Sequence, residues 1–304
     1  MEHYYSLNSY LQKTFGEKVY KISLELATTC PNRDGTLDTR GCSFCLAGSS
    51  HFATGGAEIH SQIEKAKKLV ADKTKAKRFI AYFGSYTNTY GNLEHLKNVF
   101  TQVVQRPDIA ALSIATRPDC LGPEVLSMLQ ELNAIKPVWV ELGLQTANEE
   151  TAKAIRRHYV NEVYVEAVGQ LRSRQIEVVT HIILGLPGET LEDALGSVDL
   201  AVKAGTTGVK LQLLHVLRGT DMHKQYEAGE FAVLSLEEYI HWLFACIRRL
   251  PANIVVHRIT GDAPKLHLVQ PQWSADKKTV LNAINRAAAQ QKLCQGADAF
   301  CGSP

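Results

Sequence analysis

The sequence predicts an α/β fold in which helices cover a six-stranded parallel sheet. Strand-like segments alternate with helical segments along most of the chain. The strand segments are nearly continuous apolar runs, as in parallel sheets that are buried on both faces. No Gly-x-Gly-x-x-Gly turn follows the first strand, which disfavours an open doubly wound sheet and leaves an incomplete barrel as the better alternative.

The first element is a strand-like run at residues 20–26, where Tyr20, Ile22, Leu24 and Leu26 alternate with other residues. Further strands are predicted at residues 79–83, 109–115, 138–144, 178–184 and 209–214. Helices are predicted at residues 93–104, 123–132, 149–156, 163–173 and 191–204. The helix at 123–132 has a proline in its first turn, where the missing N–H costs nothing.

The pattern changes beyond residue 220. A helix is predicted at 236–250, a strand at 254–257, a Gly/Asp/Pro turn at 261–264 and a last helix at 278–291. We therefore expect a barrel at residues 1–220, with a cysteine loop at 28–50, and a small C-terminal α/β extension at 221–304 packed on it.

Composition narrows the class of protein. The chain has 304 residues and a formal net charge of +2, too small to indicate a polyanionic partner by itself. No signal segment or membrane-length apolar run is visible, so we expect no membrane association and a cytoplasmic location. Seven cysteines, an odd number, argue against a disulfide framework. The basic clusters Lys65–Arg78, Arg156-Arg157, Arg172 with Arg174, and Arg248-Arg249 are candidate phosphate contacts, or ordinary solvated helix faces.

Three cysteines follow the first strand. Cys30, Cys42 and Cys45 stand in a C-x11-C-x2-C spacing with no fourth cysteine nearby. A cubane iron–sulfur cluster normally takes four thiolates, so three would leave one iron open for chemistry, as an open position does in catalytic zinc sites. The alternatives are a structural zinc site completed by His51 and a set of unrelated thiols.

Polar and glycine residues follow the predicted strands, where barrel enzymes place their active sites. They lie at residues 83–90, 116–119, 143–146, 185–189, 215 and 218–220. Glu141, Gly143 and Gln145 share one face of their strand because side chains alternate. A buried glutamate and glutamine in an apolar strand are costly unless they bind something.

Together these motifs resemble the radical S-adenosylmethionine (SAM) enzymes, and within them the YhcC/YtqA group, relatives of the catalytic subunit of elongator. The resemblance rests on the three cysteines and on residues 82–90, 113–120, 140–146, 185–189 and 260–264. Most of the superfamily has a shorter C-x3-C-x2-C loop, so the long spacer marks the subgroup. Gly84 is a departure, because the family has a glutamine or glutamate in this neighbourhood.

The resemblance implies a partial (β/α)6 TIM-like barrel in which Cys30, Cys42 and Cys45 hold a [4Fe–4S] cluster. SAM would chelate the open iron through its methionyl amine and carboxylate. After reduction by a donor such as flavodoxin or ferredoxin, SAM would yield methionine and a 5′-deoxyadenosyl radical. An enclosed, water-poor barrel suits such a reactive species.

Site residues follow from the same resemblance. Glu141 and Gln145 are expected to bind the ribose and methionine parts of SAM, although Glu141 would alternatively pair with a core arginine. The other expected SAM contacts are Phe44 on the adenine, Gly84 and Ser85 near the methionine amine, and Gly185 beside the adenine. Phe44 would alternatively anchor its loop.

Three residues are candidates for catalysis. Arg117 stands at a strand end and suits a carboxylate or phosphate, or a salt bridge to Asp119 or Glu141. His181 and His215 suit proton donation, although a lone histidine on an apolar strand is commonly a hydrogen-bonded core residue.

The resemblance implies modification of carbon 5 of the wobble uridine of a transfer RNA (tRNA), converting a carboxymethylaminomethyl side chain to an aminomethyl one. tRNA is then the expected partner. A radical SAM enzyme acting on a small molecule or peptide is the alternative, and a non-catalytic zinc-binding protein is a third hypothesis.

Overall fold

Seven parallel strands form the main sheet of the protein in a computed structural model that describes residues 2–46 and 58–299. The strands, in their order across the sheet, are β1 (Val19–Leu24), β2 (Arg78–Phe83), β3 (Ile109–Thr116), β4 (Val138–Gln145), β5 (Glu177–Leu184), β6 (Gly208–Leu213) and β8 (Val255–Arg258). All neighbouring pairs are parallel. A separate antiparallel pair consists of β7 (Val216–Leu217) and β9 (Leu268–Gln270).

The order of the strands in the sheet follows the chain without reversal. A doubly wound sheet reverses its order at a switch point, whereas successive βα units laid side by side curve into a barrel. In the described part of the chain, the edge strands β1 and β8 pair with one neighbour each and not with one another. The predicted partial barrel is therefore confirmed.

The strand expected at 254–257 is present at nearly these residues, but it belongs to the main sheet. It is β8, and it pairs with the free edge of β6 instead of belonging to a separate extension. The sheet has seven strands where six were expected, because β8 adds to the edge of β6 and satisfies backbone N–H and C=O groups there. Residues beyond 220 thus supply part of the barrel wall, and the boundary at 220 stays a prediction.

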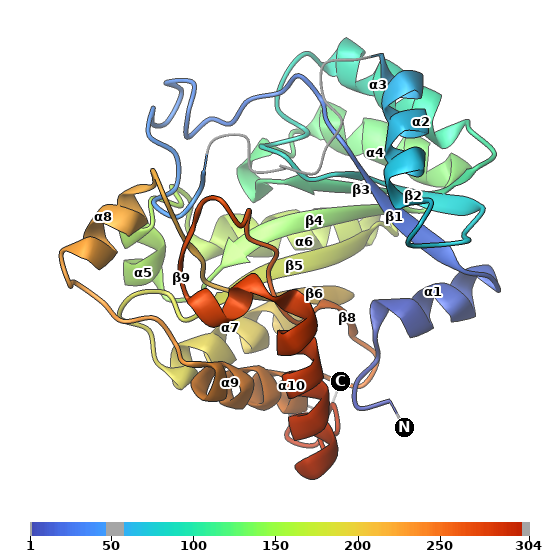
Figure 1. Cartoon of the computed structure of the whole chain (residues 1–304). Coiled ribbons are helices and arrows are strands. Elements are labelled where there is room, and N and C mark those ends of the chain that lie inside the picture. Colours follow the sequence, from blue (N-terminus) through green and yellow to red (C-terminus); the bar gives the residue numbers. More distant parts are fainter. Residues whose placement is uncertain (1, 47–57, 300–304) are drawn as a thin grey trace.

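Helices cover the outer face of the sheet (Figure 1). This layer comprises α2 (Ile59–Val70), α3 (Leu93–Val104), α4 (Pro123–Ile135), α6 (Asn161–Ser173), α7 (Leu191–Ala204) and α9 (Leu236–Arg249), with α10 (Lys277–Gln290) against α9. Their apolar faces and the outward side chains of the strands form one large core. Shorter elements are α5 (Glu149–Ala154), α8 (Asp221–Glu227), η1 (Pro118–Cys120) and η2 (Gln272–Ala275). Within the described ranges, no helix has the length and apolar character needed to span a membrane.

The amino end of the barrel is closed by α1 (Leu7–Phe15), a helix that the sequence did not predict. Leu11 packs against the inward-facing Ile80, Trp139 and Val179 in a second, smaller core. The Tyr10 hydroxyl donates to both carboxylate oxygens of Glu177 on β5, at 2.8 Å each. Figure 1 shows α1 at one end of the sheet and the loop after β1, with α5 and α8, at the other. The carboxyl end is therefore the one left for a site.

Candidate active site at the mouth of the barrel

The cysteine loop, which we define as residues 25–46, leaves the carboxyl end of β1 and is held against two short helices. The Ser43 N–H donates to the Ile155 carbonyl at 3.1 Å, just after α5, and the Met222 N–H on α8 donates to the Ser43 carbonyl at 2.9 Å. Arg156 Nε donates to the Gly41 carbonyl at 2.9 Å. The part of the loop that carries Cys42 and Cys45 is therefore fixed against α5 and α8.

The three cysteines influence one another electrostatically. Burial, with smaller contributions from Cys45 and Cys30, raises the pKa of the Cys42 thiol to about 12. Asn32 Nδ2 lies 3.3 Å from Cys42 Sγ and donates to it. Hydrogen bonds of this kind orient a metal-binding sulfur and favour its thiolate form.

The arrangement of donors suits a cluster better than one ion. Among residues 2–46 and 58–299, no three His, Cys, Asp or Glu side chains stand close enough to share a single metal ion. In a cubane, each thiolate binds a different iron, so the sulfurs stand further apart than they do around zinc. His51, the fourth ligand of the zinc alternative, lies outside the described residues.

Buried polar atoms without partners gather beside the cysteines. Six of them come from the cysteine loop and the loop after β2: Thr28 Oγ1, Asn32 Oδ1, Ser43 Oγ, Ser85 Oγ, Thr87 Oγ1 and Asn88 Oδ1. The two loops touch, since the Thr87 N–H donates to the Thr29 carbonyl at 3.2 Å. Buried polar atoms in native proteins are nearly always hydrogen-bonded. Their concentration here fits a polar ligand, as SAM is.

Tyr159 holds the two arginines of the mouth. The guanidinium carbons of Arg117 and Arg157 lie 4.9 Å and 4.8 Å from the centre of its ring, and its hydroxyl donates to the Gly143 carbonyl at the end of β4. Arg117 also makes a bidentate pair with Asp119, at 2.9 Å and 2.6 Å. This is the salt bridge considered as the alternative for Arg117, and its role toward a substrate stays a prediction.

The prediction that Arg156 and Arg157 contact phosphates is wrong. Arg157 is only 1% exposed, and its guanidinium donates to the carbonyls of Leu144 and Thr146 at 3.1 Å and 2.7 Å. Arg156 pairs with Asp221 at 2.8 Å. Both arginines are used to fix the β4–α5 turn and the cysteine loop: Arg157 is buried, and Arg156 is 15% exposed with its guanidinium paired to Asp221. The sequence could not distinguish them from an exposed basic cluster.

Gln145 ends β4 with its backbone in the left-handed region, at φ 67°. Its side chain turns back over Gly143, where an added Cβ would lie 2.6 Å from the Gln145 Nε2 atom. The structure gives this amide no hydrogen-bond partner among the described residues, so it remains available to a ligand. The Gly84 departure has a steric reason, because a Cβ there would lie 2.4 Å from the Tyr82 ring.

The remaining expected SAM contacts also lie at this end. Gly185 has φ 84° and abuts Leu234, which an added Cβ would approach to 2.9 Å. Phe44 packs against an apolar group that includes Ile155 and Leu186. The loop-anchoring alternative for Phe44 is therefore present, and its contact with adenine stays a prediction.

Below the mouth, the strands point charged side chains into the barrel. We call these residues the interior polar cluster: Lys21, Tyr82, Ser113, Glu141, His181 and Lys210, one from each of β1 to β6. Glu141 Oε1 accepts from Lys21 Nζ at 3.1 Å and from Ser113 Oγ at 2.7 Å. Glu141 Oε2 accepts from His181 Nε2 at 2.8 Å and from Lys210 Nζ.

These bonds change the assignment of two predicted residues. Glu141 is fully buried and has four donors, so no oxygen remains for SAM. It has the core ion pair considered as its alternative, with lysines in place of an arginine. His181 is one of its donors, and burial lowers the pKa of His181 to about 4. Lys21 and Lys210 were missed, although a lysine inside an apolar strand is the same signal that identified Glu141.

His215 follows β6 and packs against Gly261, where an added Cβ would lie 2.3 Å from its ring. Burial lowers the pKa of His215 to about 4, and its Nε2 atom is buried without a partner. His215 is therefore neutral near pH 7.

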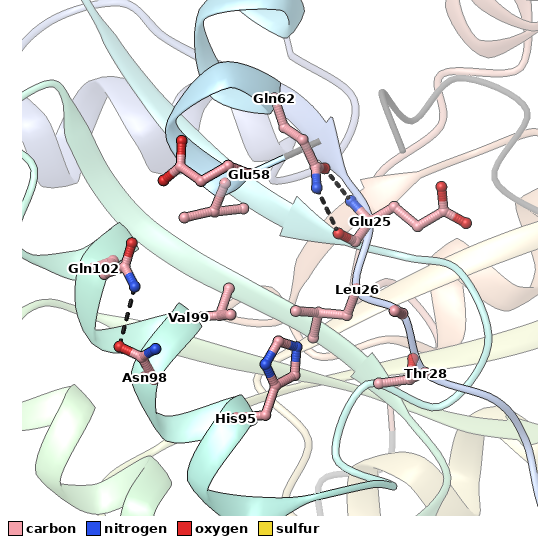
Figure 2. Close-up of a pocket in the computed structure, with 11 residues that line it drawn as sticks. Glu25, Leu26, Thr28, Glu58, Gln62, His95, Asn98, Val99 and Gln102 are labelled. Carbon is pink, nitrogen blue, oxygen red and sulfur yellow. Dashed lines mark hydrogen bonds between the residues drawn. The ribbon is translucent and has the colours of Figure 1, made fainter. Parts of the chain in front are cut away.

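A groove outside the barrel is lined on one side by residues 25–28, the start of the cysteine loop (Figure 2). It lies between α2 and α3, and the Gln62 amide crosses it to bond the backbone N–H and C=O of Glu25 at 3.0 Å and 3.1 Å. Asn98 and Gln102 are bonded to each other at 3.0 Å. The groove contains none of the predicted site residues.

Comparison with known proteins agrees with this geometry. The Radical SAM superfamily profile matches residues 28–201, and the Radical_SAM C-terminal domain profile matches residues 206–290. The chain is 41% identical to YtqA of Bacillus subtilis (strain 168) over 295 residues, which is 96% of this chain and 92% of YtqA. It is 35% identical to YhcC of Escherichia coli (strain K12) over 277 residues, covering 91% and 89% of the two chains.

Two further relatives are more distant. A tRNA uridine(34) acetyltransferase of Methanocaldococcus jannaschii is 26% identical over 166 residues, 52% of this chain and 29% of that protein. The structure of Methanocaldococcus infernus Elp3 with an N-terminal deletion superposes with a TM-score of 0.69 at 17% identity, covering 91% of this chain and 64% of Elp3. At this identity, the structural match shows the fold alone. By its sequence, this chain belongs to the radical SAM superfamily and its YtqA/YhcC group, and the cofactors of the superfamily are a [4Fe–4S] cluster and SAM.

Proposed function

We propose that this radical SAM enzyme acts on the wobble uridine of a tRNA and converts a carboxymethylaminomethyl group on carbon 5 to an aminomethyl group. SAM would serve as the two-electron oxidant and water would cleave the C–N bond, so that the carboxymethyl carbons leave as glyoxylate. The relative that carries this proposal is the M. jannaschii enzyme, whose name gives uridine 34 of tRNA as its substrate. The similarity of the fold to Elp3 is consistent with it. Cytoplasmic location and a flavodoxin- or ferredoxin-like electron donor are parts of the same proposal.

Cys30, Cys42 and Cys45 would hold the cluster. Among its described residues, the loop offers two kinds of side chain that bind metal as anions: these three thiols and the carboxylates of Glu25, Asp34 and Asp38. Asp34 and Asp38 already accept hydrogen bonds within the loop, from Thr36 and Arg40. When bound, the cluster and SAM supply a 5′-deoxyadenosyl radical, which removes one hydrogen atom from the substrate.

The residues proposed for SAM are those at the mouth with unused polar groups. The Ser85 hydroxyl is buried without a partner, and the Gln145 side chain lies over Gly143 with no hydrogen bond to it given among the described residues. Gly84, Gly185 and Phe44 would contribute backbone and ring contacts. The chain's task here is to orient SAM and exclude water, which the closed amino end of the barrel supports.

The test is performed on tRNA. Bulk tRNA from a strain lacking this protein should accumulate the carboxymethylaminomethyl nucleoside, detected by mass spectrometry. The anaerobically reconstituted enzyme should convert it to the aminomethyl nucleoside, with deuterium from the side chain appearing in 5′-deoxyadenosine. If this tRNA neither binds nor raises SAM cleavage above the uncoupled rate, the tRNA proposal fails and the small-molecule or peptide alternative replaces it.

A further inference from the structure

The charges of the interior polar cluster do not balance. It contains two lysines, Lys21 and Lys210, but one carboxylate, Glu141, which both of them contact. Elsewhere among the described residues, neither lysine has a second carboxylate partner. His181 contributes no charge near pH 7, because its pKa is lowered to about 4 by burial. When both lysines are protonated, one positive charge is therefore left over inside the barrel.

The surplus charge is held in place by an aromatic ring. The ammonium groups of Lys21 and Lys210 lie 4.5 Å and 4.6 Å from the centre of the Tyr82 ring. Cation–π contacts of this kind stabilise a cation whose water has been removed. They do not neutralise it, and burial lowers the pKa of Lys210 to about 7 despite the neighbouring Glu141, with Lys21 and Arg258 also opposing its charge.

Part of the cluster is accessible to solvent. The side chains of Lys21 and His181 are 23% and 16% exposed, whereas Glu141 is fully buried. Two residues further along β1 to β4, on the same inward face, stand the small residues Ser23, Gly84, Ala115 and Gly143, whereas β5 and β6 have Ile183 and Gln212 there. The small residues leave room on the β1–β4 side, next to Lys21.

We infer that the interior polar cluster binds the carboxylate of the substrate through Lys21 and Lys210. The inference rests on the proposed function, in which the side chain on carbon 5 ends in a carboxylate. A second carboxylate would balance the two lysines and give each a separate anionic partner. Glu141 then acts as a positioning residue that holds both lysines toward the barrel axis.

The experiment compares two anticodon stem-loop RNAs. One carries the carboxymethylaminomethyl group at the wobble uridine, and the other carries its neutral primary amide. The wild-type protein, loaded with cluster and SAM, should bind the carboxylate RNA about 10- to 100-fold more tightly, the range typical of a buried charge-assisted hydrogen bond. Lys210→Met should remove this preference, while Lys97→Met, which breaks an exposed ion pair with Glu131 on the outer helices, should keep it.

Lys210→Met is expected to fold, because Glu141 keeps Lys21, His181 and Ser113 as donors. If Lys210→Met does not fold, proton uptake measured on the wild-type protein tests the same proposal. At pH 8 the carboxylate RNA should be bound with uptake of up to about one proton, since an adjacent anion restores the charge of Lys210. The amide RNA should cause none.

Each outcome separates the two proposals. Equal binding of both RNAs without proton uptake overturns the carboxylate site and leaves the tRNA function standing. Weakened SAM binding by Lys210→Met in the absence of RNA would mean that the cluster takes the methionyl carboxylate, which also overturns it. If neither RNA binds, the tRNA proposal fails, and acetate is titrated at pH 8 instead: proton uptake that Lys210→Met abolishes supports a carboxylate site, and no uptake overturns it.

Discussion

The interior polar cluster and the mouth each bury a glutamate, and the two carboxylates have opposite electrostatic environments. Glu141 accepts hydrogen bonds from four side chains, and its pKa lies well below the usual value because Lys21, Lys210 and His181 outweigh the effect of burial. Glu189, in the turn after β5, has buried carboxylate oxygens that accept no hydrogen bond of normal geometry among the described residues, and only the Thr146 and Thr151 side chains lie near enough for weak ones. Burial raises its pKa to about 7, and nearby Thr146 and Thr151 offset this only in part.

The comparison separates what the chain builds by itself from what it leaves for a ligand. The side chains that surround Glu141 are supplied by five strands, so they are in place once the barrel folds. At the mouth, several side-chain hydroxyl and amide oxygens are buried without partners among the described residues. Burying a polar group without a hydrogen bond lowers the stability of the fold. A bound cofactor that supplies the missing hydrogen bonds should therefore stabilise this end of the barrel most.

The largest expected effect concerns the mouth. Replacing Cys30, Cys42 or Cys45 by Ala should abolish the cluster, because a cubane that already lacks one thiolate does not tolerate the loss of another. Anaerobically reconstituted wild-type protein should hold about four irons per chain. Iron analysis and the broad visible absorption of the cluster measure the loss.

Cys120 supplies the matched control, since it lies in η1 near the same loop and is partly exposed. Cys120→Ala should retain the full iron content. A wild-type protein that purifies with one tightly held zinc, released by His51→Ala, would contradict the cluster and with it the catalytic interpretation.

The second effect concerns the interior. Glu141→Ala should lower the free energy of unfolding by about 3–5 kcal/mol, because it leaves two lysines buried without their partner. Urea unfolding followed by circular dichroism measures the change. Glu131→Ala breaks the exposed pair with Lys97 and should cost less than about 1 kcal/mol. Similar losses in the two variants would show that water reaches the interior freely.

The third effect returns to the mouth. Gln145→Asn should weaken SAM binding about 10- to 100-fold, because the shortened amide no longer reaches the ligand. Asparagine tolerates the left-handed backbone, so the loss would be that of the contact. Gln175, with φ 58° at the other end of the barrel, allows the matched change Gln175→Asn. Unchanged SAM binding in Gln145→Asn would remove Gln145 from the proposed site.

Much of the fold was predictable from local sequence. The strands β2 to β6 are apolar runs separated by amphipathic helices, and each was predicted within about two residues at its ends, the usual precision of such boundaries. β8 was assigned to a C-terminal extension and not to the barrel sheet, because a four-residue strand does not reveal in the sequence which strand it pairs with. The helix α1 was missed since its single buried residue, Leu11, gives little periodic signal.

The site was predictable where chemistry depends on spacing along the chain. The cysteines and the glycine-rich strand ends are of this kind. The pairing of Glu141 with lysines from β1 and β6 was not predictable, because those residues are brought together by the barrel and are far apart in sequence. For the same reason Arg157 was taken for a surface residue, although it is buried against the β4–α5 turn.

The smallest effect tests the mouth carboxylate through pH. The folded-state pKa of Glu189, about 7, lies above its usual value of 4.5. Between these values the folded protein keeps the proton that the unfolded chain has released, so stability from this group is present at low pH and is lost as pH rises through 7. Glu189→Gln does not titrate, and we expect the wild type to lose about 1–2 kcal/mol relative to it between pH 5 and pH 7.5, a figure reduced for partial solvent screening. Urea unfolding at both pH values measures the difference, and Glu192→Gln on the exposed first turn of α7 is the control. A difference that stays constant with pH would mean that Glu189 is ionised and paired in the folded protein, and the contrast with Glu141 would then disappear.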